Sequence, residues 1–357
     1  MKKRVAIIGA GQVAEKVHAA YYKTRNELEL VAVCDPSLER GEEFRANNGF
    51  EKHYATAEEM FAVEKIDIIS ICTPNRFHFD NVMLSLANGA AVMCEKPPAM
   101  SAAEAKAMWE LAEEKGAILA YDFHHRFSSE AQFLKRNSAL LGEIYCVKAT
   151  ALRRSGVPGW GTFTNKEMQG GGPLIDMGIH MLDAAMFVLG FPKVKKVTAK
   201  SFQKIGTKKS AGTFGSWDPE KYTVEDSLFG FIELENGGLI ELDTSFALHI
   251  KPESALNVDF FGDLAGGSLY PAEIYTDNAG EFQLLEKLGQ LEENKHENSM
   301  KAFVDSVLGA GKVELAGAEQ GYIIQKLLKV YTNRQKKVRV FLYEENNREG
   351  ICIKLSK

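Results

Sequence analysis

The sequence predicts an α/β protein with two domains: a doubly wound parallel sheet, followed by an α+β domain with a largely antiparallel open sheet. Three observations lead to this prediction. The first third of the chain alternates continuous apolar runs with helix-like segments, as in a parallel sheet covered on both faces. A glycine-rich turn follows the first apolar run. After about Phe127 the runs alternate in polarity, and Asn236-Gly237 is a strong hairpin signal between two of them.

The first domain is expected at residues 1–123. Its strands are expected at residues 4–8, 28–34, 66–72, 91–94 and 118–123. Its helices are expected at residues 13–24 and 77–88 and after two capping boxes, Thr56 with Glu59 and Ser101 with Glu104. Each strand is a short apolar run, and a helix-like segment separates it from the next. This alternation is typical of βαβ units.

The second domain is expected at residues 124–340, with residues 341–357 as a C-terminal tail. Its strands are expected at residues 144–152, 194–202, 226–234, 239–246 and 255–261. Its helices are expected at residues 173–189, 296–308 and 318–333. A glycine-rich loop at residues 153–172 precedes the first of these helices, and we expect it to shape a pocket.

The composition is that of an ordinary globular protein. Its 357 residues are enough for two cores, and a net charge of −5 gives no reason to expect a nucleic-acid partner. No stretch approaches the roughly 18 apolar residues of a membrane helix, and the start is too short and polar for an export signal. The five cysteines are odd in number and form no CxxC pair, so we expect reduced thiols, no metal cluster and a cytoplasmic location.

The first glycine turn has the pattern of a dinucleotide-binding motif. Residues 9–14 read GAGQVA, between the first strand and the first helix. Gly9 permits a tight turn, Gly11 lets a pyrophosphate approach the backbone, and Ala14 allows the helix to pack closely on the strand. The free amides at the helix start would meet the phosphate charge. The alternative is a plain tight turn, which is common after strands.

Asp35 lies 24 residues beyond Gly11, at the end of the next strand. An acidic residue there accepts hydrogen bonds from the adenosine ribose, and its charge repels a 2′-phosphate, so the pattern favours NAD. Arg40 lies close enough in sequence to leave NADP open. The alternative for Asp35 is a helix cap before Pro36.

Two polar clusters follow strands, where ligands bind in open parallel sheets. Thr73, Pro74, Asn75 and His78 follow one strand, and the segment at 95–98, EKPP, follows another. Its lysine is locked in an extended conformation by the prolines and could donate a hydrogen bond or move a proton. The alternatives are a surface lysine and a solvent-facing histidine. The candidate cofactor-binding residues are Gly9, Gly11, Gln12, Val13, Asp35, Thr73, Pro74, Asn75, His78, Glu95 and Lys96.

The helix at 173–189 is apolar around nearly its whole circumference, yet it contains Asp176, His180 and Asp183. These residues are spaced i, i+4 and i+7 and share one narrow stripe. An aspartate one turn before a histidine can hold the imidazole and stabilise its charged form, as an acid–base catalyst requires. The alternatives are a satisfied buried pair and a capping aspartate. A zinc site is not expected, because no third strong ligand lies nearby and His124-His125 are remote in sequence.

Together these segments resemble the Gfo/Idh/MocA oxidoreductase family over nearly the whole chain. The motifs that carry the resemblance are GAGQVA at 9–14, CTPNRFH at 72–78, EKPP at 95–98 and GGGPLIDMGIHMLD at 170–183. The resemblance implies a Rossmann domain and an NAD(P)-dependent oxidoreductase. Such an enzyme transfers a hydride between the nicotinamide and a hydroxyl or carbonyl carbon of a sugar, inositol or related polyol.

The resemblance also implies roles for residues. Lys96, Asp176 and His180 match the family's catalytic positions, with Lys96 or His180 exchanging a proton and Asp176 orienting the site. The implied substrate-binding residues are Lys96, His124, Arg126, Trp160, Asp176 and His180. The segment at 121–127 departs from the family pattern, with Asp122 in place of a small residue and His124 in place of an asparagine, which leaves the substrate open.

Family members commonly pair through the open sheet, which implies a homodimer or homotetramer acting on a small polar molecule, with no membrane partner. Two other functions fit the sequence. The first is an NAD(P)-binding sensor without turnover, against which the complete set of acid–base residues argues. The second is an NAD-dependent glycosidase, which would release sugar without net NADH.

Overall fold

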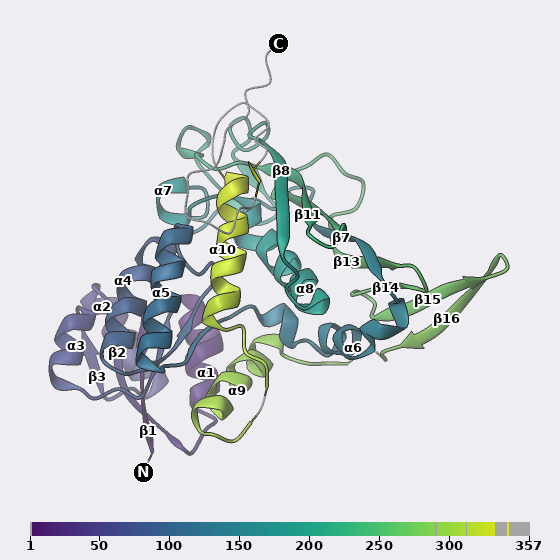
Figure 1. Cartoon of the computed structure of the whole chain (residues 1–357). Helices are drawn as coiled ribbons and strands as arrows, with labels where there is room; N and C mark the ends of the chain where they lie inside the picture. Colours follow the sequence, from purple (N-terminus) through teal and green to yellow (C-terminus); the bar gives the residue numbers. More distant parts are fainter. Residues whose placement is uncertain (1, 290, 312, 333–340, 343–357) are drawn as a thin grey trace. The chain divides into compact units, whose positions relative to one another are not determined.

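The computed structural model describes residues 2–289, 291–311, 313–332 and 341–342 (Figure 1). Within them the chain forms two compact units. The first contains the residues up to His124 together with Asn294–Gln325. The second contains His125–Glu293 and the described residues from Lys326 onward.

This division differs from the predicted one in its late segment. The sequence placed residues 294–325 in the second domain, whereas the structure places them in the first unit. Helix α9 (Lys295–Val307) packs Phe303 into the apolar core of the first unit, and the ion pair of Arg25 with Asp305, at 2.8 Å, ties the same helix to it. The helix joins this unit because its apolar face is buried there.

The first unit is a parallel sheet with strand order β3-β2-β1-β4-β5-β6, which confirms the predicted doubly wound architecture. The strands are β1 (Lys3–Ile8), β2 (Leu28–Cys34), β3 (Lys52–Tyr54), β4 (Ile68–Ile71), β5 (Ala91–Cys94) and β6 (Leu119–Tyr121). The order reverses between β1 and β4, the switch point at which open sheets bind ligands. The Gly9 turn follows β1 directly.

Helices connect these strands. They are the π-helical turn Ala14–Ala19, α1 (Ala20–Tyr22), α2 (Leu38–Asn48), α3 (Ala57–Val63), α4 (His78–Ala87) and α5 (Ala102–Lys115). Ser101 and Glu104 form the complete predicted capping box of α5. At α3 the Thr56 hydroxyl accepts from the Glu59 amide, which is one half of the predicted box.

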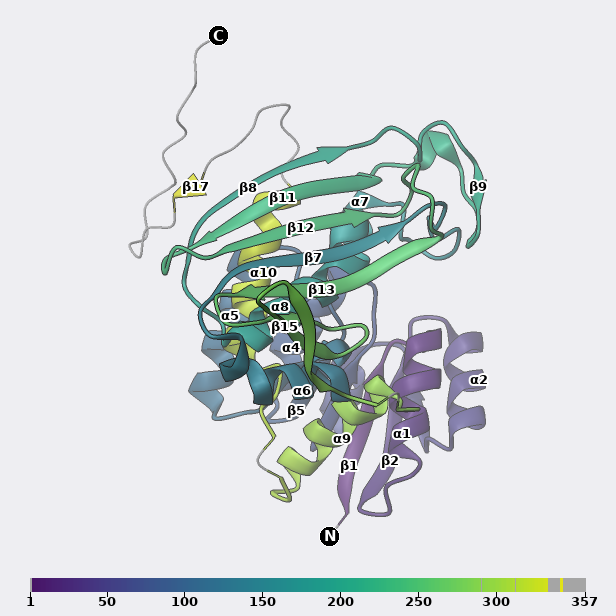
Figure 2. The same cartoon turned by 90° about the vertical axis from the view of Figure 1, so that its right-hand side faces the viewer.

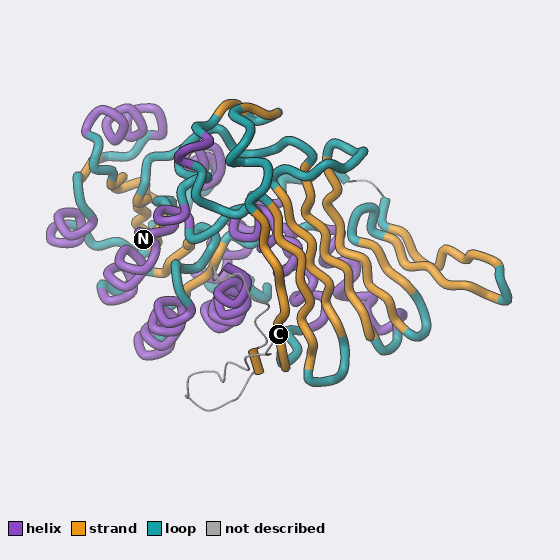
Figure 3. Tube along the Cα trace, turned by 90° about the horizontal axis from the view of Figure 1, so that it is seen from above, coloured by secondary structure: helices purple, strands orange, loops and turns teal. Residues whose placement is uncertain are grey.

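The second unit contains a nine-stranded sheet in the described residues, with order β16-β15-β14-β13-β7-β12-β11-β8-β17 (Figures 2 and 3). Its principal strands are β7 (Ile144–Arg153), β8 (Val194–Phe202), β11 (Ser227–Leu234), β12 (Leu239–Ser245) and β13 (Ser254–Gly262). The shorter strands are β14 (Gly266–Ser268), β15 (Glu273–Asn278), β16 (Glu281–Lys287) and β17 (Phe341–Leu342). The pairs are antiparallel except β7 with β12, so the predicted largely antiparallel sheet is confirmed.

A buried helix packs on this sheet. A π-helical turn, Leu174–Gly178, leads into α8 (Ile179–Leu189), in which every residue from Ile179 to Val188 is buried. Among the described residues, the helix at 166–189 is long and apolar enough to cross a membrane, contrary to the expectation that no stretch approaches this length. Of an 18-residue stretch within it, 89% is buried inside the protein, as in a core helix.

The remaining helices are α6 (Ser129–Asn137), α7 (Lys166–Gln169) and α10 (Ala318–Thr332). The last of these is the helix predicted at 318–333, and Asn333 lies outside the described residues. Most of the predicted tail at 341–357, including Cys352, also lies outside them.

Candidate active site

The glycine turn of the first unit has the geometry that its sequence predicts. Gly9 has a φ of +96°, and a Cβ there would lie 2.7 Å from the carbonyl oxygen of Cys72. Both observations require glycine. At Gly11, in contrast, a Cβ would meet no atom within 4 Å, so the backbone faces open space at the start of the helix. Gln12 and Val13 are exposed beside it. A dinucleotide pyrophosphate fits this turn.

The carboxylate of Asp35 is fixed next to this turn. It accepts from the amide of Ala10 at 3.0 Å and from the amide of Ser37 at 2.9 Å. The guanidinium of Arg40 donates two further bonds, at 3.1 and 2.7 Å. Burial acts to raise the pKa of Asp35, but the hydrogen bonds from Arg40 and the two amides outweigh it and lower the pKa. Asp35 is therefore a held anion at the end of β2.

His78 is fully buried, so the alternative of a solvent-facing histidine is wrong. Its Nδ1 lies 2.8 Å from the carbonyl oxygen of Pro97, and its Nε2 lies 3.0 Å from that of Thr73. Both ring nitrogens thus contact backbone, and the imidazole joins the segment after β4 to the segment after β5. These segments contain Asn75 and Lys96, which the sequence placed at the cofactor.

A buried polar cluster beside Lys96 was missed in the sequence. His18, on the π-helical turn, places Nδ1 2.8 Å from the Ser70 hydroxyl and Nε2 3.1 Å from Glu95 Oε1. The other carboxylate oxygen of Glu95 accepts from the amide of Lys96 at 3.3 Å. His18 therefore positions the acid of the EKPP segment. The partners are separated by up to 77 residues, and no local pattern could have paired them.

Asp122 and His124, where the sequence departs from the family pattern, lie in the same region of the first unit. Asp122 Oδ2 is 2.6 Å from Nδ1 of His296, and the ring of His124 lies on that of His296 with centroids 3.7 Å apart. Burial lowers the pKa of His124 to about 3. Burial also acts on Asp122 and His296, but their mutual hydrogen bond lowers the pKa of Asp122 and raises that of His296.

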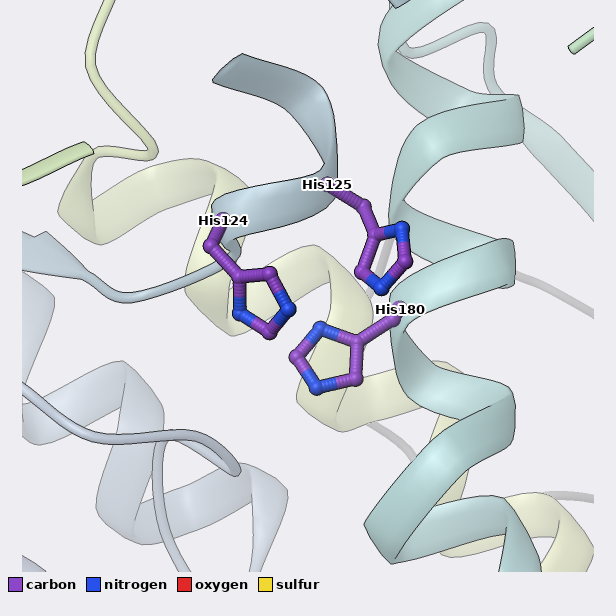
Figure 4. A group of neighbouring side chains, drawn as sticks. All are labelled: His124, His125 and His180. Carbon is purple, nitrogen blue, oxygen red and sulfur yellow. The ribbon is translucent and has the colours of Figure 1, made fainter. Parts of the chain in front are cut away.

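In the second unit, Asp176, His180 and Asp183 each meet a different residue. Asp176 Oδ2 is 4.0 Å from an Nη atom of Arg153. The ring of His180, which is buried, lies 5.1 Å from that of His125 (Figure 4). His125 in turn places Nδ1 2.8 Å from the hydroxyl of Tyr270. The expectation that Asp176 holds the His180 imidazole stays a prediction, and His125 is a neighbour that the sequence did not identify.

Arg126 and Asp183 form the third contact of the stripe. Both side chains are 0% exposed, and two hydrogen bonds join them, one from Nε to Oδ2 at 2.9 Å and one from Nη2 to Oδ1. The guanidinium also lies over the rings of Phe187 and Phe191, at 5.4 and 5.2 Å. These contacts place Arg126 in the packed core of the second unit.

An exposed aromatic group neighbours Asp176 through Arg153. Trp160, 52% exposed, meets the rings of Phe163 and Phe214 edge-on at 6.2 and 5.9 Å. The guanidinium of Arg153 lies 4.8 Å above the ring of Phe214. From the sequence only Trp160 was predicted here, because Phe214 lies in a separate short hairpin at residues 211–216.

The helices of both glycine-rich motifs begin with a π-helical turn, Ala14–Ala19 in the first unit and Leu174–Gly178 in the second. Such turns are rare and occur frequently at functional sites. At Gly178 a Cβ would lie 2.2 Å from a methyl carbon of Thr244, so glycine lets the helix approach β12. This close approach fixes the position of Asp176 on its sheet.

Comparisons with known proteins agree with both halves of this description. Residues 3–123 match the model of the Gfo/Idh/MocA oxidoreductases with an NAD-binding Rossmann fold, and residues 137–340 match the C-terminal α/β domain of the same family. The chain is 56% identical to D-glucoside 3-dehydrogenase of Escherichia coli K12, over 95% of this chain and 97% of that protein.

More distant proteins are also similar to this chain. Inositol 2-dehydrogenase of Rhizobium meliloti is 30% identical over 61% of this chain and 63% of its own length. A levoglucosan dehydrogenase in complex with NADH and levoglucosan superposes with a TM-score of 0.76 at 18% identity, covering 92% of this chain and 95% of that one. The fold and the class of NAD-binding oxidoreductase expected from the sequence are thereby confirmed.

Proposed function

The chain belongs to the Gfo/Idh/MocA oxidoreductase family, and from this premise we propose that it is an NAD-dependent dehydrogenase that oxidises the 3-hydroxyl of a D-glucoside. The observation that carries the proposal is the 56% identity to D-glucoside 3-dehydrogenase over nearly the full length of both chains. The motifs at 9–14 and 95–98 lie within the first family match, at residues 3–123, and the motif at 170–183 lies within the second, at residues 137–340.

The cofactor is held by the first unit. The backbone at Gly9, Gly11, Gln12 and Val13 binds the pyrophosphate, and Asp35 accepts from the adenosine ribose. Bound NAD supplies a hydride acceptor. The segments that His78 joins present the nicotinamide-side residues, which are Thr73, Pro74, Asn75, Glu95 and Lys96.

We assign the proton chemistry to Lys96, Asp176 and His180. His180 takes the proton from the hydroxyl being oxidised, since an imidazole exchanges protons near neutral pH. The ring of His125 lies 5.1 Å from that of His180, and its Nδ1 is 2.8 Å from the hydroxyl of Tyr270. Lys96 donates a hydrogen bond to the developing carbonyl oxygen, and Asp176 orients the substrate with Arg153.

The exposed aromatic group supports a sugar-like substrate that has an apolar face. Trp160 and Phe214 offer ring surface, and Arg153 links them to Asp176. An aromatic ring packs well against the C–H face of a pyranose, while charged groups bind its hydroxyls. A glycoside presents both surfaces. His124 and Arg126 remain proposed substrate contacts from the family resemblance alone.

We further propose a homodimer or homotetramer that works in the cytoplasm. Phe231 and Phe261 are 47% and 38% exposed, and each alternates with buried neighbours of the sheet, so they lie on its outer face. A second copy would cover them. Free thiols at Cys34, Cys72 and Cys94 suit a reducing compartment.

The test measures NADH formation by absorbance with NAD and NADP in parallel, on methyl glucosides, free glucose and inositols. Reduction of the product with borodeuteride then locates the new carbonyl. We expect NADH with glucosides, deuterium at carbon 3, and loss of both in His180→Ala. His249→Gln, at an exposed histidine, is the matched control.

Three results would redirect the proposal. Binding of NAD without turnover on any sugar would favour the sensor. Release of the aglycone without net NADH would favour the glycosidase. Deuterium at another carbon would keep the dehydrogenase but overturn the position of oxidation.

A further inference from the structure

Five ionisable side chains gather beyond the ends of β5 and β6 in the first unit. Asp122, His124 and His296 offer one nitrogen or oxygen atom each, all within 4.8 Å of one another. His18, Glu95 and Asp122 form a second such group, so Asp122 is shared between the two. The mechanism proposed above uses none of the three residues of the first group in proton transfer.

The fold places these residues by backbone contacts. Asp122 directly follows β6, and its amide donates to the carbonyl of Cys94 at 3.0 Å. His124 begins the short turn at 124–127. His296 lies in the first turn of α9, whose start is capped by the side chain of Asn294. The three elements meet because α9 packs into the core of this unit.

The two carboxylate oxygens of Asp122 differ in their hydrogen bonding. Oδ2 is 2.6 Å from Nδ1 of His296. Oδ1 is buried and has no hydrogen-bond partner among the residues that the structure describes. The Asp122 side chain is 0% exposed, and a carboxylate oxygen of Glu95 lies within 4.8 Å of a carboxylate oxygen of Asp122. An unsatisfied buried carboxylate oxygen is costly, more so beside another carboxylate, and a bound cation would remove that cost.

We propose that Asp122, His124 and His296 bind a divalent transition-metal ion, zinc by preference. Two imidazole nitrogens and one carboxylate oxygen are ligands that zinc takes, and three protein ligands leave a fourth position for water. On binding, the metal replaces the proton between His296 and Asp122, which leaves to solvent. Glu95 and His18, hydrogen-bonded to each other at 3.1 Å, would support the site from the other side of Asp122.

This site contradicts the sequence-based expectation that the protein binds no metal. That expectation rested on motif spacing, and the ligands here are separated by as many as 174 residues. No motif search would join positions 122 and 296. The proposal concerns the first unit alone and does not depend on the proposed substrate.

The experiment titrates the full-length protein, stripped with a chelator, with Co²⁺ followed by visible absorption and with Zn²⁺ in competition. We expect saturation at one equivalent, with an intense tetrahedral Co²⁺ spectrum that Zn²⁺ abolishes. Asp122→Asn and His296→Gln should each weaken binding by more than about 100-fold, beyond the usual effect of losing a supporting residue. His249→Gln, at an exposed histidine outside the cluster, should bind as the wild type does.

The proposal is overturned if the wild type shows no saturable binding, or if both ligand variants bind as the wild type does. Circular dichroism establishes that each variant is folded. If Asp122→Asn does not fold, His296→Gln decides, because its side chain is one-third exposed and tolerates change better. Dehydrogenase activity is not the readout, so failure of the metal site and failure of the proposed function are told apart.

Discussion

Replacing Asp183 by asparagine should destabilise the protein strongly, because the change leaves the charge of Arg126 buried without its anion. The two side chains are 0% exposed and share two hydrogen bonds. Asparagine has nearly the same size, so the loss is electrostatic rather than steric. Removing one partner of a buried ion pair costs about 3–5 kcal/mol. A folded domain has only about 5–15 kcal/mol of stability, so this loss is a large share.

The assay is urea denaturation followed by circular dichroism, with midpoints compared at equal slope. Lys221→Met, which breaks an exposed pair with Asp218, is the control and should cost no more than about 1 kcal/mol. Arg126→Met combined with Asp183→Leu should recover most of the loss, since a matched apolar pair needs no desolvation of charge. If Asp183→Asn and Lys221→Met have the same midpoint, the buried-pair reasoning is wrong.

The same double variant separates two roles of Arg126. The family resemblance implies a substrate contact, whereas the structure shows a guanidinium held by Asp183 in the core. With a core role, KM for the substrate is unchanged in the double variant. A rise in KM of about tenfold, 1.4 kcal/mol of binding, in a stable double variant would instead establish Arg126 as a substrate ligand.

Three further predictions concern the cofactor half. Gly11→Val should weaken NAD binding by more than about tenfold but leave Tm unchanged, because a side chain at this position meets only open space in the protein itself. Gly9→Ala should lower Tm, because Gly9 has a φ of +96° and a Cβ there would meet the carbonyl of Cys72. Equal Tm values for the two variants would contradict this reasoning. Asp35→Asn should improve kcat/KM with NADP relative to NAD, and an unchanged ratio would remove Asp35 from cofactor selection. The pKa of Asp35 is lower in the folded than in the unfolded chain, so its carboxylate stabilises the folded protein above about pH 4, and this stabilisation is lost as pH falls through the folded pKa. The urea midpoints of wild type and Asp35→Asn should therefore converge as the pH is lowered. Midpoints that stay the same distance apart at every pH would refute this.

The strands that were predicted in both sheets each have a local pattern, whereas β3, β14, β15, β16 and β17 were not predicted. The bounds of β2 and β5 follow from apolar runs with clear ends. Helix α2 was missed because its residues are mostly polar and Gly41 interrupts it, so no apolar stripe appears. Strand β16 was missed because every one of its residues is exposed, and alternation requires one buried face.

Site residues were likewise predictable only where a local sequence motif marks them. Lys96 and His180 lie in motifs whose neighbours along the chain define them. His18, Arg153 and His296 have no such motif, since the ionisable side chains that they meet are 23 to 174 residues away. A residue defined by a distant partner is found only when the fold brings the two together.

The stripe on α8 and the turn before it limits what spacing can establish. Asp176, His180 and Asp183 share one face by their spacing, yet they meet Arg153, His125 and Arg126 in turn. Exposure decides among them: the carboxylate of Asp176 retains solvent contact, while that of Asp183 has none and is matched with a charge inside the core. Because a buried charge must be paired before it can do anything else, Asp183 is committed to folding, and the proposed ligand contact falls to Asp176. Shared spacing therefore predicts a shared face, whereas the partner and the burial of each residue on that face depend on the fold.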